Sequence, residues 1–291
     1  MDPHLLRTFV TVAECGSFSA AADRLGYTQS AVSQHIAALE QDLGTPLLRR
    51  RPVAPTPSGE RLLEHAGPIL LRLDAARADV RRTLATSPGA VTIAASPLAA
   101  VHLATALREV RRSYPGTEVT LTVSGREDVS QGVANGTFAL GLVDGVAAPS
   151  DPLRLSDAVS LRTTPVAHDD LVVALPNDHP LARRRGLSLD DLADARWIDA
   201  PDVAAPLPAL RAAASGGLRA ALTYSGTDLL TFHSLIAAGH GVAVLPRAAG
   251  GPDVTTVALT SPRLLHRVEL LHGHLTEPAA EALAAVLSDL E

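Results

Sequence analysis

Apolar residues recur every three or four positions through residues 5–13, 19–25 and 28–43, and this spacing predicts three short helices. A glycine follows each of these stretches and is a favourable C-terminal stop. Four prolines fall within residues 46–57, where they exclude a continuing helix and predict a short extended hairpin. The first 60 or so residues are therefore predicted to form a small helical module that ends in a hairpin.

The third predicted helix combines an apolar stripe with an almost uncharged polar face. The apolar stripe consists of Val32, Ile36, Leu39 and Leu43. The small and amide side chains of its first two turns are those of Thr28, Gln29, Ser30, Ser33 and Gln34. Such a face suits a helix that lies in the major groove of DNA and hydrogen-bonds to base edges, whereas a solvated helix normally carries Lys and Glu. An ordinary amphipathic core helix is the alternative for this segment alone.

Arg49, Arg50 and Arg51 form the densest positive charge in the amino-terminal module. Two short helices joined by a tight turn and followed by a hairpin have the layout of a winged helix-turn-helix. Arginines in such a hairpin would contact phosphates, which adds affinity but no sequence information. The alternative interpretation is a solvated loop, which is the usual environment of adjacent arginines.

A long amphipathic helix is predicted over about residues 56–86, because Thr56-Pro57 is a helix start signal and Ser87-Pro88-Gly89 is a stop signal. A long helix between two domains buries its apolar stripe only when another helix packs beside it. The simplest partner is the same helix of a second copy, so we expect a homo-oligomer. Packing against its own chain is the alternative.

Strand-like and helix-like runs alternate over the remaining two-thirds of the chain. Repeated strand–helix units predict parallel sheets covered by helices. We expect two lobes, one formed by about residues 89–162 with 266–291 and the other by about 163–265, with strands that cross between them near 160–168 and 262–267. Two lobes joined in this way enclose a cleft.

Ligands of open α/β sheets collect at the carboxyl ends of the strands, and these ends supply the candidate binding residues. The candidates are Ser96, Pro97, Ser124, Gly125, Asp144, Ala200, Asp202, Thr227 and Pro246. Ser96 is the strongest, because its hydroxyl and the following N–H groups can hold a carboxylate. A capping role is the alternative that we favour for Thr227 and, more strongly, for Ser124. Asp144 with Asp199 or Asp202 would suit an amino group, although solvated loop carboxylates are the commoner explanation.

Composition narrows the class of protein. All 25 basic residues are arginine, and the net charge of −6 excludes indiscriminate coating of nucleic acid, so any DNA contact must come from a local patch. The single cysteine, Cys15, excludes an internal disulfide and fits a reducing compartment. The sequence has no recognisable signal peptide and no stretch of membrane-spanning length, so we expect a cytoplasmic protein.

The sequence offers little support for catalysis or a bound metal. Its 11 histidines include no pair at the spacing of a helical metal site, and the pair His272 and His274 lacks nearby carboxylates. It has no nucleophile elbow, phosphate-binding loop or dinucleotide glycine fingerprint. The run His168-Asp169-Asp170 looks catalytic, but we predict a solvent-facing turn there. We therefore expect no enzyme, no metal and no cofactor.

The run GSFSAAADRLGYTQSAVSQHIAALEQDLGTPLLRRR, followed by PTPSGERLL, resembles the winged helix-turn-helix of LysR-type transcriptional regulators. RRSYPGTEVTL, DLVVALPNDHPLA, SLDDLADARWI and AAGHGVAVLP resemble, more loosely, the effector-binding domain of that family. The resemblance implies an α/β protein with a mostly α-helical winged helix-turn-helix at residues 1–58 and a dimerising linker helix at 59–88. It further implies a two-lobed effector-binding domain, with a periplasmic-binding-protein-like fold, at 89–291, in which Ser96 contacts the effector.

The expected function is that of a sequence-specific DNA-binding transcriptional regulator that responds to a small-molecule effector bound between the lobes. Its expected partners are double-stranded DNA carrying an imperfect inverted repeat, the effector and further copies of the chain in a homodimer or homotetramer, with RNA polymerase as an additional candidate. One rival is a solute-binding or enzymatic cleft protein whose amino-terminal module mediates assembly. The other is an architectural DNA-binding protein without an effector.

Overall fold

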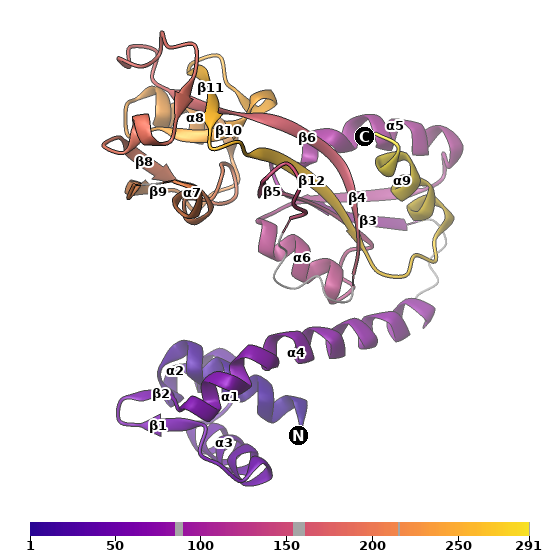
Figure 1. Ribbon diagram of the computed structural model, residues 1–291. Helices are drawn as coiled ribbons and strands as arrows, with labels where there is room; N and C mark the ends of the chain where they lie inside the picture. Colours follow the sequence, from indigo (N-terminus) through magenta and orange to yellow (C-terminus); the bar gives the residue numbers. More distant parts are fainter. Residues whose placement is uncertain (85–89, 154–160, 215, 291) are drawn as a thin grey trace. The chain divides into compact units, whose positions relative to one another are not determined.

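The structure is a computed structural model with two units, residues 1–77 and 78–291 (Figure 1). The residues that it describes are 1–84, 90–153, 161–214 and 216–290. No helix in these ranges is long and apolar enough to cross a membrane.

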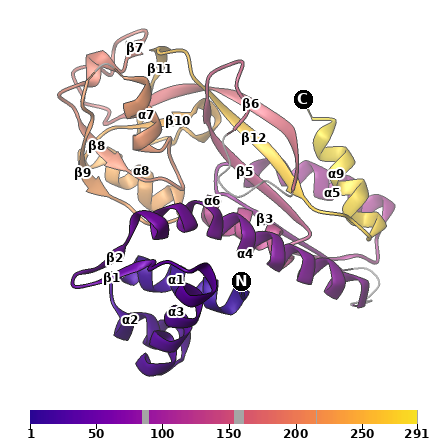
Figure 2. The ribbon, with the colours of Figure 1, turned by 60° about the horizontal axis from the view of Figure 1, so that its bottom comes forward.

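The first unit contains the three predicted helices and the predicted hairpin, which are thereby confirmed (Figure 2). Its elements are α1 (Pro3–Cys15), α2 (Phe18–Leu25), α3 (Gln29–Leu43), β1 (Leu48–Arg50), β2 (Val53–Pro55) and the start of α4 (Pro57–Leu84). Ser17 and Thr28 cap α2 and α3 with their hydroxyl oxygens. Left-handed glycines end the first three helices, at Gly16, Gly26 and Gly44. The predicted long helix is α4.

The core of the first unit lies between its first three helices. The side chains with at most 1% exposure include Leu6, Phe9, Val12, Val32, Ile36 and Leu39. The predicted apolar stripe of α3 is therefore buried as far as Leu39. The prediction is wrong for Leu43, which lies in the last turn of α3 and is 41% exposed. Burial of one face of α3 leaves its polar face directed outwards.

The second unit contains the strands and helices that follow the long helix. Its elements are β3 (Ala90–Ala95), η1 (Ala100–His102), α5 (Leu103–Ser113), β4 (Glu118–Val123), α6 (Arg126–Ala134), β5 (Leu140–Ala147), β6 (Arg162–Leu175), β7 (Leu187–Ser188), η3 (Asp190–Leu192), β8 (Arg196–Asp199), α7 (Leu207–Ala213), β9 (Arg219–Thr223), α8 (Leu229–Ala237), β10 (Ala243–Pro246), η4 (Arg247–Ala249), β11 (Thr255–Ser261), β12 (Leu265–His272) and α9 (Pro278–Ser288).

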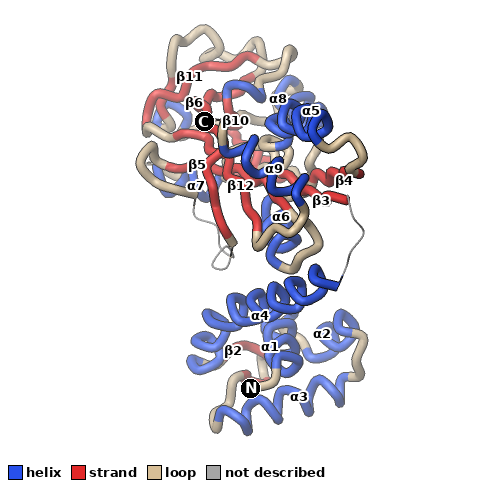
Figure 3. The backbone as a smooth tube through the Cα atoms, turned by 90° about the vertical axis from the view of Figure 1, so that its right-hand side faces the viewer, coloured by secondary structure: helices blue, strands red, loops and turns tan. Residues whose placement is uncertain are grey.

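An eight-stranded sheet runs through both lobes. Seven of its strands follow the order β4-β3-β5-β12-β6-β11-β7, and the eighth, β10, also pairs with β6. In the first lobe β4, β3 and β5 are parallel. Helices α5 and α9 pack on one face of this part of the sheet and α6 packs on the other (Figure 3). The second lobe adds the parallel pair of β8 and β9.

Two long strands, β6 and β12, connect the lobes (Figure 1). They pair antiparallel from Leu265 beside Asp170 to His272 beside Arg162. Beyond this stretch β6 continues into the second lobe, where residues 171–175 pair with β10 and β11. The two strands therefore connect the lobes and lie beneath the space between them.

Three predictions for the second unit are wrong in detail. The sheet is not parallel throughout, because β12 returns the chain to the first lobe and runs antiparallel to both β5 and β6. The helix predicted from Pro97 begins only at Ala100 as a 3-10 turn and at Leu103 as α5, because the backbone first turns back on the Ser96 carbonyl. Residues 168–170 lie inside the unbroken strand β6 and not in a turn.

Candidate functional site

The outward face of α3 offers uncharged hydrogen-bonding side chains from its first two turns. Gln29, Ser30 and Gln34 are exposed, and Ser33 is half-buried. The Thr28 hydroxyl is engaged at the helix start, where it accepts the N–H three residues further on at 3.2 Å and lies 3.0 Å from the hydroxyl of Ser30. Thr28 thus supports the face by capping α3, while the following side chains point away from the core.

Polar contacts fix the position of α3 within the first unit. The Nδ1 atom of His35 lies 3.1 Å from the hydroxyl of Thr8 on α1. Near the other end of α3, Glu40 accepts hydrogen bonds from the N–H groups of Leu47 at 2.8 Å and Leu48 at 3.2 Å. Through this carboxylate the hairpin is attached directly to α3.

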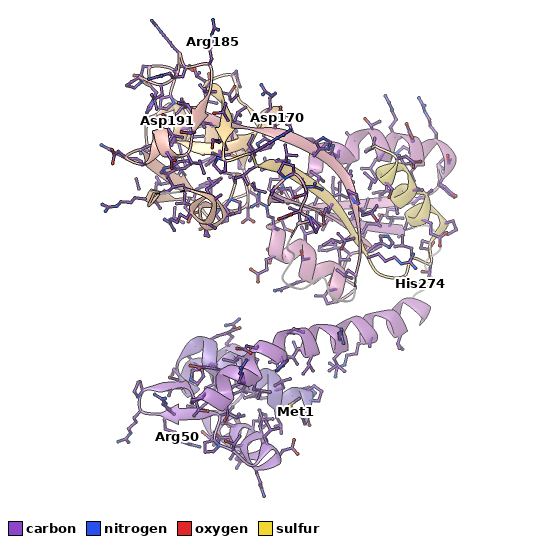
Figure 4. All side chains as sticks on the ribbon, viewed as in Figure 1. Met1, Arg50, Asp170, Arg185, Asp191 and His274 are labelled. Carbon is purple, nitrogen blue, oxygen red and sulfur yellow. The ribbon has the colours of Figure 1, made fainter. Side chains whose placement is uncertain are left out.

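The predicted arginine cluster lies on the hairpin. Residues 49–51 are all exposed, and the guanidinium carbon of Arg50 lies 5.6 Å from the centre of the Phe18 ring on α2. An Arg side chain over an aromatic ring gains a cation–π attraction while its edge stays open to solvent. The arginines thereby place positive charge beside the first helix of the helix-turn-helix pair. Figure 4 shows Arg50 on the hairpin side of the unit.

The second unit contains a buried polar cluster that joins the residue after β3 to the middle of β5; Asp144 was predicted to follow its strand but lies inside it, because β5 continues to Ala147 in pairing with β12. Asp144 is 2% exposed and accepts three side-chain hydrogen bonds: from the Ser96 hydroxyl at 2.6 Å, from Arg126 Nη2 at 2.6 Å and from His266 Nε2 at 3.0 Å. Ser96 and His266 are buried as well, with 0% and 4% exposure. We call these four residues the Asp144 cluster.

Burial by itself would raise the pKa of Asp144, but the charge of Arg126 and the hydrogen bonds from His266 and Arg126 hold that pKa well below its usual range. The carboxylate is therefore ionised at neutral pH. Because an ionised carboxylate only accepts hydrogen bonds, the Nε2 atom of His266 must carry the proton that it donates.

Arg126 also contacts the second lobe. Its Nη2 donates to the carbonyl oxygen of Ala204 at 3.1 Å, and its backbone N–H donates to Asp202 at 3.0 Å. The Asp202 carboxylate lies so close to Gly125 that a Cβ there would be 3.0 Å from it. The amino-terminal end of α6, a favourable place for an anion, is thus occupied by a carboxylate of the chain itself.

Two cavities adjoin the Asp144 cluster. The first has a volume of about 540 Å³ and lies between α6, the residues after β5 and the start of α7; Arg126 and Asp144 line it. The second has a volume of about 400 Å³ and lies over β6 and β12; Pro97, His266 and Pro246 line it. Both lobes contribute residues to each cavity. Asp144 lines the first cavity and His266 lines the second, so the hydrogen bond between these two residues lies between the cavities.

Two family models match the chain. The bacterial regulatory helix-turn-helix protein, lysR family, matches residues 3–60, and the LysR substrate binding domain matches residues 85–290. The chain belongs to the LysR family of transcriptional regulators. It is therefore a DNA-binding regulator with an effector-binding domain.

Individual proteins agree with this assignment. The regulator is 32% identical to the probable HTH-type transcriptional regulator LrrA of Synechococcus elongatus, over 97% of its own chain and 95% of the relative. It is 26% identical to the HTH-type transcriptional regulator CysL of Bacillus subtilis, over 94% and 91%. Its structure is similar to that of an OxyR C206 mutant from Corynebacterium glutamicum, with a TM-score of 0.54, 25% identity and coverage of 99% and 91%.

The structure of this LysR-type regulator brings together part of the predicted effector set. Ser96, Gly125, Asp144 and Asp202 meet at or beside the Asp144 cluster, and Pro97 and Pro246 line the second cavity. Ala200 is buried in the core of the second lobe. Ser96 donates its hydroxyl to Asp144, so the carboxylate that it holds belongs to the chain.

The capping roles considered for Ser124 and Thr227 are wrong. Gly125 is the N-cap of α6, and the Asp228 side chain caps α8 by accepting the N–H of Thr231 at 2.7 Å. Thr227 is exposed, and it is absent from the described lining of both cavities. The Ser124 hydroxyl is buried and has no hydrogen-bond partner within the described ranges.

Sequence patterns did not reveal Arg126 or His266, which supply two of the three donors to Asp144. Arg126 follows a candidate glycine directly, and only its basic character in an otherwise acidic segment distinguishes it. His266 falls in the second segment that was predicted to cross between the lobes, near 262–267. The alternation of apolar residues along such a strand does not distinguish a functional histidine. In the described part of the chain, no group of three or more His, Cys, Asp or Glu residues is arranged to hold a metal ion.

Proposed function

We propose that this LysR-type regulator recognises an imperfect inverted repeat through the exposed polar face of α3, and that a small molecule bound between the lobes of its second unit controls this activity. The observation that supports DNA reading best is the uncharged outward face of α3 beside an arginine-bearing hairpin. A reading helix needs side chains that hydrogen-bond to bases, and the hairpin adds phosphate contacts.

The proposed base-reading residues are Gln29, Ser30, Ser33 and Gln34, and Thr28 belongs to the same DNA-binding surface at the start of α3. Gln29 or Gln34 can form paired hydrogen bonds to adenine, and a good pair discriminates against a wrong base by about 1–3 kcal/mol. Arg49, Arg50 and Arg51 are proposed to contact phosphates. Their contribution should depend steeply on salt and little on sequence.

A selection of bound genomic fragments with the full-length protein tests the first part of the proposal and yields the operator. Ser33→Ala should then reduce the preference for that operator over a scrambled site, whereas Arg50→Ala should weaken binding to both alike. Equal loss of preference in both variants would contradict this division of labour. No retention of any fragment at low salt would contradict DNA reading altogether and favour a cleft protein without this role.

We further propose that the protein works as a homodimer or homotetramer, held in part by α4, because two reading helices match an inverted repeat. An effector that binds one arrangement of the lobes more tightly than another shifts the population toward it and so repositions the DNA-binding units. Contact with RNA polymerase would link this shift to transcription. Light scattering with and without DNA tests the assembly.

The proposed domain boundaries are a winged helix-turn-helix at residues 1–58, a linker helix at 59–88 and an effector-binding domain at 89–291. We also propose that the regulator acts in the cytoplasm without catalysing a reaction, which is supported by relatives that are named as transcriptional regulators. An architectural role without an effector predicts that no small molecule changes operator binding, and this separates the two proposals experimentally.

A further inference from the structure

The second cavity, of about 400 Å³, has mostly apolar walls and lies where the two lobes and the connecting strands meet. The first lobe contributes Pro97, Leu98 and Val101, and the second lobe contributes Leu229 and Pro246. Pockets of this size and character bury most of a compact ligand, and a few polar groups then fix its orientation. The polar groups of this cavity therefore decide which ligand it accepts.

Three imidazoles supply most of the polar character, and each comes from a different element. His102 is the last residue of η1, directly before α5, His233 lies on α8 and His266 lies on β12. His168 also adjoins the cavity, but it pairs with Arg267 across the strands, and strand alternation directs its side chain to the face opposite that of His266. We call His102, His233 and His266 the cavity histidines.

The cavity histidines differ in how much hydrogen-bonding capacity they have left. His233 is engaged through Nε2 with the carbonyl oxygen of Ala249 at 2.9 Å. His266 donates its Nε2–H to Asp144, so only its Nδ1 atom is available to a ligand. His102 is half-buried, and the described residues provide no hydrogen-bond partner for its ring. A ligand group that bonds to His102 and His266 would satisfy nitrogens that the protein itself leaves open.

The surroundings of His102 disfavour the protonated form of its ring. Burial lowers the pKa of His102 and the nearby charge of His266 lowers it further, while Asp169 opposes both effects. Asp169 faces the cavity but already accepts the N–H of Ala248 at 2.8 Å. The other carboxylate beside these rings, Asp144, is neutralised within its own cluster.

We propose that the second cavity is the effector site and that it binds a compact apolar molecule with one carboxylate, held between His102 and His266. This rests on the proposed function, in which the effector lies between the lobes. An anion beside His102 stabilises the protonated form of that ring and offsets the repulsion that opposes its protonation. The apolar walls meanwhile bury the rest of the molecule.

The assignment has a pH signature with a definite sign. The carboxylate stays ionised above about pH 6, whereas the imidazole gains a proton on binding, so affinity should rise as the pH falls, by up to about tenfold per pH unit. A neutral ligand held by hydrogen bonds would show little dependence. A cation would bind more weakly as the rings become protonated, so the sign distinguishes the three ligand classes.

The experiment uses the full chain and three matched probes: cyclohexanecarboxylate, cyclohexanecarboxamide and cyclohexylmethylamine. Titration calorimetry at about pH 6 and about pH 8, in buffers that differ in ionisation enthalpy, gives both affinity and proton uptake. We expect saturable binding of the carboxylate, tightest at the lower pH, with uptake on the order of one proton per ligand. This test uses the wild-type protein, so its outcome does not depend on whether a variant folds.

Variants locate the proton. His102→Gln retains a hydrogen-bonding side chain but cannot titrate, so it should remove most of the proton uptake and of the pH dependence. His274→Gln is the matched control, because His274 lies on the loop after β12, on the side of the first lobe remote from the second (Figure 4), and is not part of the described cavity lining. It should bind the carboxylate as the wild type does.

Several results would overturn the inference: no saturable binding of the carboxylate, tighter binding of the amide or amine, or unchanged proton uptake in His102→Gln. Operator retention measured with the same probe separates this outcome from the proposed function. Carboxylate binding that depends on His102 but leaves DNA binding unchanged would support the cavity assignment and contradict its role as the effector site. If a small molecule changes DNA binding equally in the wild type and in His102→Gln, the proposed function is supported and the assignment of the second cavity as the effector site is contradicted.

Discussion

Replacement of Asp144 by Asn tests the Asp144 cluster most directly. The substitution keeps the shape of the side chain and removes its charge. Arg126 and His266 would then lose the carboxylate that they share, although the amide can still bond to one or two of the three donors. The Arg126 side chain is only 17% exposed, so water replaces the lost partner poorly.

The structure allows the cost to be estimated. Removing one partner of a buried ion pair typically destabilises a protein by about 3–5 kcal/mol. The residual exposure of Arg126 and the remaining hydrogen bonds place Asp144→Asn at the lower end, about 3 kcal/mol. For a unit of about 200 residues this corresponds to a fall in Tm of about 6–12 °C.

Trp197 provides the assay. It is the only tryptophan of the chain, it is 1% exposed and it lies in the second unit, so its fluorescence reports unfolding of that unit. Glu127→Gln, on the exposed surface of the same helix as Arg126, makes the same change in charge and should alter stability by less than about 0.5 kcal/mol. It is the matched control for Asp144→Asn.

A double-mutant cycle then isolates the pair. Arg126→Gln combined with Asp144→Asn removes both charges, so the double variant should be more stable than the sum of the single losses predicts, by about 2 kcal/mol. A loss below about 1 kcal/mol for Asp144→Asn, or additive losses in the cycle, would refute the view that the pair is buried and interdependent.

The other predictions concern both units. Gly59→Ala should destabilise the first unit severely in thermal melts, because a Cβ there would overlap the carbonyl oxygen of Leu47, a backbone atom that cannot move aside freely. Glu40→Gln should weaken DNA retention without changing operator preference, since Glu40 attaches the hairpin to α3 at 2.8 Å. Because the folded-state pKa of Asp144 is depressed, its stabilising contribution is complete above about pH 4 and is lost as the pH falls further; urea titrations at several pH values should show this loss in the wild type and a flatter curve in Asp144→Asn.

Short-range rules suffice for the first unit. The caps at Ser17 and Thr28, the glycine stops and the 3.6-residue stripe act within a few residues of one another, so the sequence alone predicts α2, α3 and the hairpin. Leu43 is the exception, because its exposure depends on how far the neighbouring helices extend over α3. The parallel strands of the first lobe are likewise predictable from their apolar runs.

The Asp144 cluster depends instead on residues that are distant along the chain. Ser96, Asp144 and His266 are drawn together by the pairing of β3, β5 and β12, and no local pattern records that β12 returns between β5 and β6. The sequence placed Ser96 and Asp144 among the candidate residues near the ends of strands, but it could not show that the Ser96 hydroxyl donates to the Asp144 carboxylate.

By itself, then, the sequence determined the DNA-binding module and the alternating architecture, because helix caps, turn residues and periodic apolar positions act locally. Only the tertiary structure decided that the carboxylate beside Ser96 is the chain's own and that the cavity histidines come together over β6 and β12. Side chains that meet across a sheet carry no signature in sequence spacing, since the strand order that joins them is set by the packing of the whole unit.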